Sequence, residues 1–207
     1  MALADLPPLH SLTDVDRLFL TRTPISDLTP LSDLTRLRVL GLRLTRVGDV
    51  ARLSGLTHLE SLILSFTPVF DVMPLGGLRR LQSLYLTGSL VRDIAPLASL
   101  VALTRVDLGG TPVTDLRPLA GLTELQSLQL SGTEVTDVRP LASLKKLRVL
   151  ELGHTKVDDF SPIRSLAALR RLDIRGTSVT DISSFPRLPG CEIVSATTFR
   201  RRRDNLI

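Results

Sequence analysis

The chain has 207 residues, of which 43% are hydrophobic and 23% charged, a balance typical of globular proteins that excludes an intrinsically disordered chain. No apolar run approaches the roughly 18–20 residues that cross a bilayer, and the first residues lack the basic and apolar regions of a secretion signal, so we expect a cytoplasmic protein without membrane insertion. The net charge is +5, but Arg200 to Arg203 supply four of these charges, so we expect a nearly neutral body and a basic tail.

A repeat of 22 residues organises the chain. Leucine recurs at this interval, and Val15 and Cys191 continue the series at its two ends. The leucines of the series are Leu37, Leu59, Leu81, Leu103, Leu125, Leu147 and Leu169. Such a period is typical of a solenoid, in which each unit buries its apolar face against its neighbours. We therefore expect a single domain over 1–207, with a partial unit at 1–14, eight units over 15–190, and a half-unit cap with the basic tail over 191–207.

Each unit is predicted to begin with a short strand and to continue into a turn. In the unit that starts at Leu125, Leu128 and Leu130 alternate with polar residues, which is the pattern of a strand with one buried face. A proline then precedes two leucines, Leu141 and Leu144, whose three-residue spacing suits a short helical or 3-10 turn. Strands of successive units must therefore stack in parallel, with the turns on the outer side.

The run TPVTDLRPLAGLTELQSLQL, from Thr111 to Leu130, resembles the leucine-rich repeat family, and more narrowly its 22-residue subtype found in internalin-like and phosphatase-regulating proteins. The resemblance covers essentially the whole chain. It implies an α/β fold, a right-handed solenoid with parallel strands on the concave face and short helical or 3-10 turns on the convex side.

One position departs from the family, which usually places Asn there. This chain has a hydroxyl residue instead, at Thr23, Thr45, Thr67, Ser89, Thr111, Thr133, Thr155 and Thr177. Asn can bridge the backbones of adjacent units, whereas a hydroxyl has a shorter reach. We therefore expect a tighter ladder of hydrogen bonds between units.

Aspartate recurs at one position of every unit, at Asp27, Asp49, Asp71, Asp93, Asp115, Asp137, Asp159 and Asp181. Carboxylates stacked about 5 Å apart invite a calcium hypothesis. The alternative is that each Asp accepts a hydrogen bond from the backbone of the following turn. We favour capping, because a calcium site needs several oxygens converging on one point, and we predict neither a metal nor a cofactor.

No constellation of residues predicts catalysis. His10, His58 and His154 occupy three different positions of the unit, and we interpret them as surface residues. Cys191 takes the place of a strand leucine, and we interpret it as a buried apolar side chain rather than a reactive thiol. Phosphate-binding, hydrolase and zinc-protease motifs are absent from the sequence, so we predict that the protein is not an enzyme.

The strand residues that alternate with the leucines are predicted to project from the concave face. They are apolar or aromatic in the N-terminal half and polar or charged in the C-terminal half, a combination typical of protein-binding surfaces. Phe70 is expected as a further exposed aromatic on the outer flank. The candidate binding residues are Phe19, Val39, Leu44, Ile63, Phe66, Tyr85, Arg105, Asp107, Gln129, Glu151, Arg171 and Asp173.

The sequence therefore predicts a non-catalytic module that binds a protein or peptide on its concave face. Two alternatives stay open. The chain could be a regulatory or sensing module of a larger signalling or enzyme assembly, or it could bind an anionic surface or nucleic acid through Arg200 to Arg203, which is the weaker interpretation of so short a run. The N-terminal end enters in mid-unit at Leu3 without a capping helix, so we expect it to be covered by Met1 to His10, by self-association or by an upstream domain.

Overall fold

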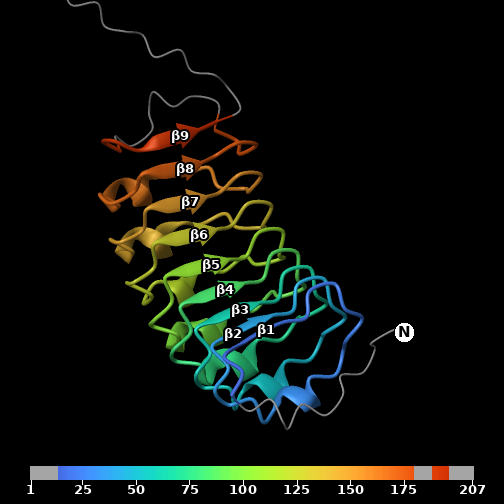
Figure 1. Cartoon of the computed structure of the whole chain (residues 1–207). Coiled ribbons are helices and arrows are strands. Elements are labelled where there is room, and N and C mark those ends of the chain that lie inside the picture. The colour runs from blue at the N-terminus through green and yellow to red at the C-terminus, as the bar shows by residue number, and fades with distance from the viewer. Residues whose placement is uncertain (1–13, 180–187, 196–207) are drawn as a thin grey trace, which may run out of the picture.

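The computed structural model describes residues 14–179 and 188–195, and within them the predicted solenoid is confirmed. Nine short strands form one sheet in chain order, and each strand pairs in parallel with the next. Figure 1 shows the strands stacked one above another from β1 to β9. The strands are β1 (Arg17–Phe19), β2 (Val39–Gly41), β3 (Ser61–Ile63), β4 (Ser83–Tyr85), β5 (Arg105–Asp107), β6 (Ser127–Gln129), β7 (Val149–Glu151), β8 (Arg171–Asp173) and β9 (Glu192–Val194).

The core is a single column of branched side chains. From β2 to β8 the middle residue of each strand is buried, as is the apolar residue two positions later, for example Leu62 and Leu64 in the unit of β3. The first and third residues of the strands face the other way, as the alternation predicts. The buried cluster runs without a break from Ile25 to Ile174, so each unit is stabilised by burial against its neighbours.

Short 3-10 turns lie between the strands on the other side of the core. Every turn except η2 has a proline at its first or second position. The missing N–H of proline costs little there, because that donor would be unpaired at the start of a helical turn. The turns are η1 (Thr29–Leu31), η2 (Ala51–Leu53), η3 (Met73–Gly77), η4 (Ala95–Ser99), η5 (Arg117–Leu119), η6 (Arg139–Ser143) and η7 (Ser161–Ser165).

The recurring aspartates cap these turns, as predicted. Each described Asp accepts a hydrogen bond from the backbone N–H two residues later, at 2.7–2.9 Å. These hydrogen bonds lower the pKa of Asp27 and of Asp159, because they stabilise the carboxylate. The part of the chain that the structure describes contains no cluster of His, Cys, Asp or Glu arranged to hold a metal ion, and Asp181 lies outside it.

The hydroxyl residues behave differently from the prediction, because their side chains do not form a ladder between units. Each Thr hydroxyl instead donates to a backbone carbonyl three residues earlier in its own unit, as Thr111 does to Leu108 at 2.6 Å. The same bond recurs at Thr23, Thr45, Thr67, Thr133, Thr155 and Thr177. The hydroxyl is too short to reach the adjacent unit, so adjacent units are joined at this level by backbone hydrogen bonds.

Ser89 is the exception, and it leads to a stability prediction. Its hydroxyl is buried and has no hydrogen-bond partner in the described structure. Ser89→Ala should therefore change the free energy of unfolding by less than about 0.5 kcal/mol, whereas Thr111→Ala should lower it by about 1–2 kcal/mol by removing a satisfied hydrogen bond and a buried methyl group. Urea unfolding of both variants measures the difference, and equal losses would contradict it.

The last strand departs from the expected register by one residue. The 22-residue period places Val194 beside Leu172, but in the structure Ile193 pairs with Leu172 and Val194 pairs with Asp173. A shift of one residue exchanges the two faces of a strand, and here it turns Ile193 toward the core, where it packs partly buried. The expectations for the N-terminal end and for the basic tail concern residues outside the described part of the chain.

Candidate functional site

The parallel register places the predicted binding residues in columns on the strand face. The third residues of successive strands lie side by side, so Phe19 is beside Gly41, Gly41 beside Ile63, and Ile63 beside Tyr85 and then Asp107. Adjacent strands lie about 4.8 Å apart, so residues 22 positions apart in sequence are in contact distance. The structure thus brings the N-terminal group of predicted residues together.

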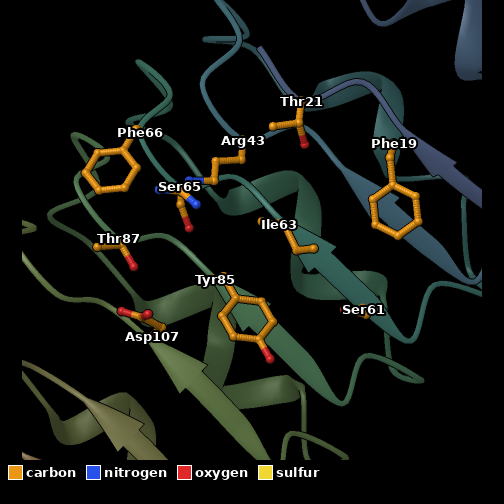
Figure 2. A pocket seen from close by; sticks show the side chains of 10 residues that line it. All are labelled: Phe19, Thr21, Arg43, Ser61, Ile63, Ser65, Phe66, Tyr85, Thr87 and Asp107. Atoms are coloured by element: carbon orange, nitrogen blue, oxygen red, sulfur yellow. The ribbon is translucent and has the colours of Figure 1, made fainter.

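These residues line a groove of about 650 Å³ over β1 to β5. Figure 2 shows the rings of Phe19, Phe66 and Tyr85 around Ile63 and Arg43. The residues that line the groove are Phe19, Thr21, Arg43, Ser61, Ile63, Ser65, Phe66, Tyr85, Thr87 and Asp107. A second hollow of about 250 Å³ shares Phe66, Thr87 and Asp107 with the groove and extends to Gln129 over β6.

Two glycines give the aromatic rings their positions. A Cβ atom at Gly41 would lie 2.5 Å from the ring of Phe19, and one at Gly88 would lie 2.6 Å from the ring of Phe66. Real Cβ atoms do not approach that closely, so each ring occupies space that a side chain in place of the glycine of the next unit would fill. The rings stay accessible nonetheless, because Phe19 is 59% exposed and Phe66 is 46% exposed.

The backbone is left-handed four positions after the middle of each strand, where the chain turns away from the sheet. Four of the eight units have Gly there, namely Gly88, Gly110, Gly132 and Gly176, with φ between 64° and 71°. The other four units have side chains in the same conformation: Arg22, Leu44, Phe66 and His154, with φ between 57° and 61°. A left-handed residue that is not glycine costs about 1–2 kcal/mol. The two bulky apolar residues, Leu44 and Phe66, are both exposed at the edge of the groove.

Polar groups supply the rest of the groove. The Arg43 guanidinium lies 5.3 Å from the centre of the Phe66 ring, within the range of a cation–π interaction. At the β5 end of the groove, Asp107 accepts a hydrogen bond from the Gly109 N–H at 3.0 Å. The groove therefore has a cation among its aromatic rings and a carboxylate at its β5 end.

The charged residues predicted at the C-terminal end are engaged with one another. Arg171 pairs with Glu151 at 3.2 Å and with Glu192 at 3.0 Å. Asp173 was expected to be exposed, but its side chain is only 2% exposed, and Arg175 binds both of its oxygens. Burial by itself raises the pKa of Asp173, yet the hydrogen bonds from Arg175 outweigh it and hold the pKa below its ordinary value. Arg171 thus links three neighbouring units, whereas Arg175 and Asp173 pair within one unit.

The remaining predicted residues lie around the groove or beyond it. Val39 is half-buried in β2 beside Ser61, which lines the groove. Arg105 is exposed on β5, two residues before Asp107. Gln129 lines the smaller hollow, and its side-chain oxygen accepts a hydrogen bond from the Ser131 N–H at 2.7 Å.

The other titratable groups considered in the sequence lie away from the groove. His58 and His154 are exposed, as predicted, and His10 lies outside the described residues. Cys191 packs partly buried against the core, and burial raises the pKa of its thiol, which favours the unreactive protonated form. No helix within the described ranges is both long enough and apolar enough to cross a membrane.

Comparison with known proteins agrees with this geometry. A family model for leucine-rich repeats in two copies matches residues 123–165. Internalin C2 from Listeria monocytogenes is 37% identical, with a TM-score of 0.77 over 78% of this chain and 71% of its own. The chain belongs to the leucine-rich repeat family.

Two further solved structures share the fold of this leucine-rich repeat protein. Another internalin from Listeria monocytogenes is 24% identical, with a TM-score of 0.71 over 95% of this chain and 78% of its own. A leucine-rich repeat protein from Leptospira interrogans is 25% identical, with a TM-score of 0.85, and the match covers 91% of this chain and 51% of that protein. A search of curated proteins found no match.

Sequence analysis of this leucine-rich repeat protein missed the polar lining of the groove. Thr21, Arg43, Ser65 and Thr87 occupy one position of successive units, two residues after the third strand residue. The signal that could have located them is the recurrence of glycine immediately after that position, at Gly88, Gly110, Gly132 and Gly176. Recurring glycine at a fixed position indicates a left-handed turn, and the residues before it border the strand face.

Proposed function

We propose that this leucine-rich repeat protein is a non-catalytic recognition module that binds a protein or peptide in the groove over β1 to β5. The proposal places the apolar anchors at Phe19, Ile63, Phe66 and Tyr85. Aromatic side chains in well-packed hollows supply a large share of the energy in protein interfaces.

The backbone at Leu44 and Phe66 is the observation that carries the proposal. Glycine would relieve the strain at both positions, and the chain itself uses glycine at the same position in four other units. The units of β2 and β3, which both contribute to the groove, instead hold large apolar side chains in an unfavourable conformation and expose them to water. Strain that folding does not need is found at functional sites, and here it positions apolar side chains for contact.

We also infer that the chain belongs to the 22-residue, internalin-like subtype with a hydroxyl in place of the ladder Asn. The parallel pairs from β1 to β8 follow one another at this interval, for example Leu62 with Leu84. The Thr hydroxyls and Asp caps repeat the same internal hydrogen bonds in most of the described units.

Phe66→Gly tests the proposed function without disturbing the core. The variant should keep or slightly raise the free energy of unfolding, by up to about 1 kcal/mol, because the strain at Phe66 is removed. Capture of a partner from a lysate of the source organism, with quantitative mass spectrometry of the retained proteins, should fall by about 30-fold, as expected for a central anchor.

His154→Gly is the matched control, because His154 has the same left-handed backbone but lies over Gly176, far along the stack from the groove. It should relieve the same strain and leave capture unchanged. A partner retained equally by the wild type and by Phe66→Gly would exclude the groove as the binding site.

A further inference from the structure

The apolar surface of the groove continues over its edge. In the segment 66–70, Thr67 and Val69 are buried, whereas Phe66, Pro68 and Phe70 are exposed. The chain turns at Phe66 and Thr67, and from there to Phe70 exposed side chains alternate with buried ones. Phe70, which is 67% exposed, thus extends the surface that begins at Phe66.

Neighbouring units widen this surface. The Leu44 N–H donates to the Ser65 carbonyl at 3.0 Å, which places Leu44 beside Phe66. The Leu90 N–H donates to the Val69 carbonyl at 2.8 Å, which places exposed Leu90 beside the same segment. We define the apolar rim as Leu44, Phe66, Pro68, Phe70 and Leu90.

The rim is confined to one part of the stack. Within the described residues, the large apolar side chains that are exposed all lie between Phe19 and Val101. The positions that correspond to Phe66, Pro68 and Phe70 hold no large apolar residue in the units of β5, β6 and β7. They are Gly110, Pro112 and Thr114 in the first of these units, Gly132, Glu134 and Thr136 in the second, and His154, Lys156 and Asp158 in the third. The repeat itself therefore does not require an apolar rim.

Unpaired arginines border the rim. Arg22, Arg43, Arg46 and Arg92 are exposed and form no ion pair within the described structure. They are the only charged residues in the segments that form this edge of the first four units, 21–26, 43–48, 65–70 and 87–92. The aspartates that directly follow these four segments, Asp27, Asp49, Asp71 and Asp93, cap the turns.

In the corresponding segments of the later units, positive and negative charges are equal in number. Over 109–114, 131–136, 153–158 and 175–180 the chain has two cations, Lys156 and Arg175, and two anions, Glu134 and Asp158. Lys156 pairs with Glu134, and Arg175 pairs with Asp173. The early units thus carry an excess of positive charge around their apolar residues that no carboxylate of the described chain neutralises by pairing.

We propose that the partner is a protein segment with apolar side chains set among Asp and Glu residues, which covers the apolar rim and enters the groove. The inference rests on the proposed function and specifies the chemistry of the partner. Carboxylates of the partner would pair with Arg22, Arg43, Arg46 and Arg92, and its apolar side chains would cover the rim. Asp107 at the far end of the groove would accept a hydrogen bond from the partner's backbone or a basic side chain.

A protein segment fits this surface better than a phosphate-rich ligand. A nucleic acid or an anionic membrane would also be attracted to the arginines. Three of the five rim residues, however, are leucine or proline and offer no aromatic ring on which a base could stack. A phosphate-rich ligand would in addition meet the carboxylate of Asp107 and find no donor for it.

Selection from a library of random 12-residue peptides displayed on phage tests the inference at about 150 mM salt. We expect the peptides that bind to be enriched in Asp and Glu next to aromatic or branched residues. Their affinity should fall by about tenfold in the Arg43→Gln, Arg46→Gln variant and by about 30-fold in Phe66→Gly. The control variant is Arg117→Gln, Arg139→Gln, which removes the same formal charge from arginines that pair with Asp115 and Asp137, and it should leave affinity unchanged within about twofold.

Three other results would contradict the inference, and they can be distinguished from one another. Peptides that depend on Phe66 but show no enrichment in acidic residues, and bind both arginine variants equally well, would overturn the acidic partner and leave the proposed function standing. Peptides that do not depend on Phe66 would overturn the proposed function together with this inference. A labelled single-stranded oligonucleotide, or vesicles with anionic lipid, that bind more tightly than any peptide and lose binding in Arg43→Gln, Arg46→Gln would overturn the assignment to a protein.

Discussion

Leu128→Ala should lower the free energy of unfolding by about 3–4 kcal/mol, a large fraction of the stability of a typical domain. Leu128 is the middle residue of β6, is fully buried, and lies in register between Val106 and Leu150. Removing its side chain leaves a cavity that neighbours on both sides hold open, because each belongs to a unit fixed by its own turn and cap. Urea denaturation followed by far-ultraviolet circular dichroism measures the loss.

Leu18→Ala provides the comparison for this prediction. Leu18 occupies the same position in β1 but is only partly buried, and among the described strands it pairs with β2 alone. The loss should be about 1–2 kcal/mol, because less surface is buried and the site can relax. Equal losses at Leu18 and Leu128 would contradict the view that stability comes from burial between two neighbouring units.

Arg175→Met should destabilise the C-terminal units by about 2–3 kcal/mol at neutral pH, because it leaves the buried carboxylate of Asp173 without its cation. The estimate lies below that for a fully buried pair, since Arg175 itself is half-exposed and its backbone N–H still donates to Asp173 at 2.9 Å. Methionine keeps the length of the side chain, so the loss is one of charge and hydrogen bonding. Thermal unfolding of wild type and variant measures it.

Arg117→Met is the matched control. Arg117 holds both oxygens of Asp115 in the same geometry, two residues apart in sequence, but both side chains are exposed. Exposed ion pairs contribute little, so this variant should lose less than about 0.5 kcal/mol. A similar loss in both variants would indicate that burial of Asp173 is unimportant.

The pH dependence of Arg175→Met follows from Asp173. In the wild type its pKa is lowered, so the stabilisation is present above the ordinary pKa of a carboxylate and is lost as pH falls through the folded-state pKa. Without Arg175, burial raises the pKa instead, so the folded state binds a proton more readily than the unfolded chain and stability declines as pH rises. The difference in free energy of unfolding between the wild type and the variant should therefore shrink as the pH falls from 7 to about 4. A difference that grows in acid would contradict this account.

The architecture could be predicted from the sequence because one 22-residue pattern of leucine, proline and aspartate recurs in eight units. The leucine spacing predicted the strands, the proline the turns, and the aspartate the caps, and the structure confirmed each of these. The register of β9 could not be predicted by counting, because the unit before it is one residue short and the choice between Ile193 and Val194 depends on which fits the end of the core.

The candidate site was predictable only in part. Alternation along the strands correctly placed Phe19, Ile63, Tyr85 and Asp107 on one surface. It could not distinguish the accessible carboxylate of Asp107 from the buried one of Asp173, because that difference depends on a neighbouring arginine. The periodicity of the sequence could not predict the strained backbone at Phe66 either. The strain is recognised only when the φ angle of Phe66 is compared with the φ angles of the glycines at the same position in other units.

The left-handed position after each strand gives the fold one adjustable site per unit. Its occupant is glycine in four units and an exposed side chain in the other four, while the strand pairing and the core continue unchanged. Two proteins could then share every leucine, proline and aspartate of this repeat, melt at similar temperatures and bind unrelated partners. Comparisons weighted toward the repeat residues would group such proteins together, whereas the residues at this one position would separate them by what they recognise.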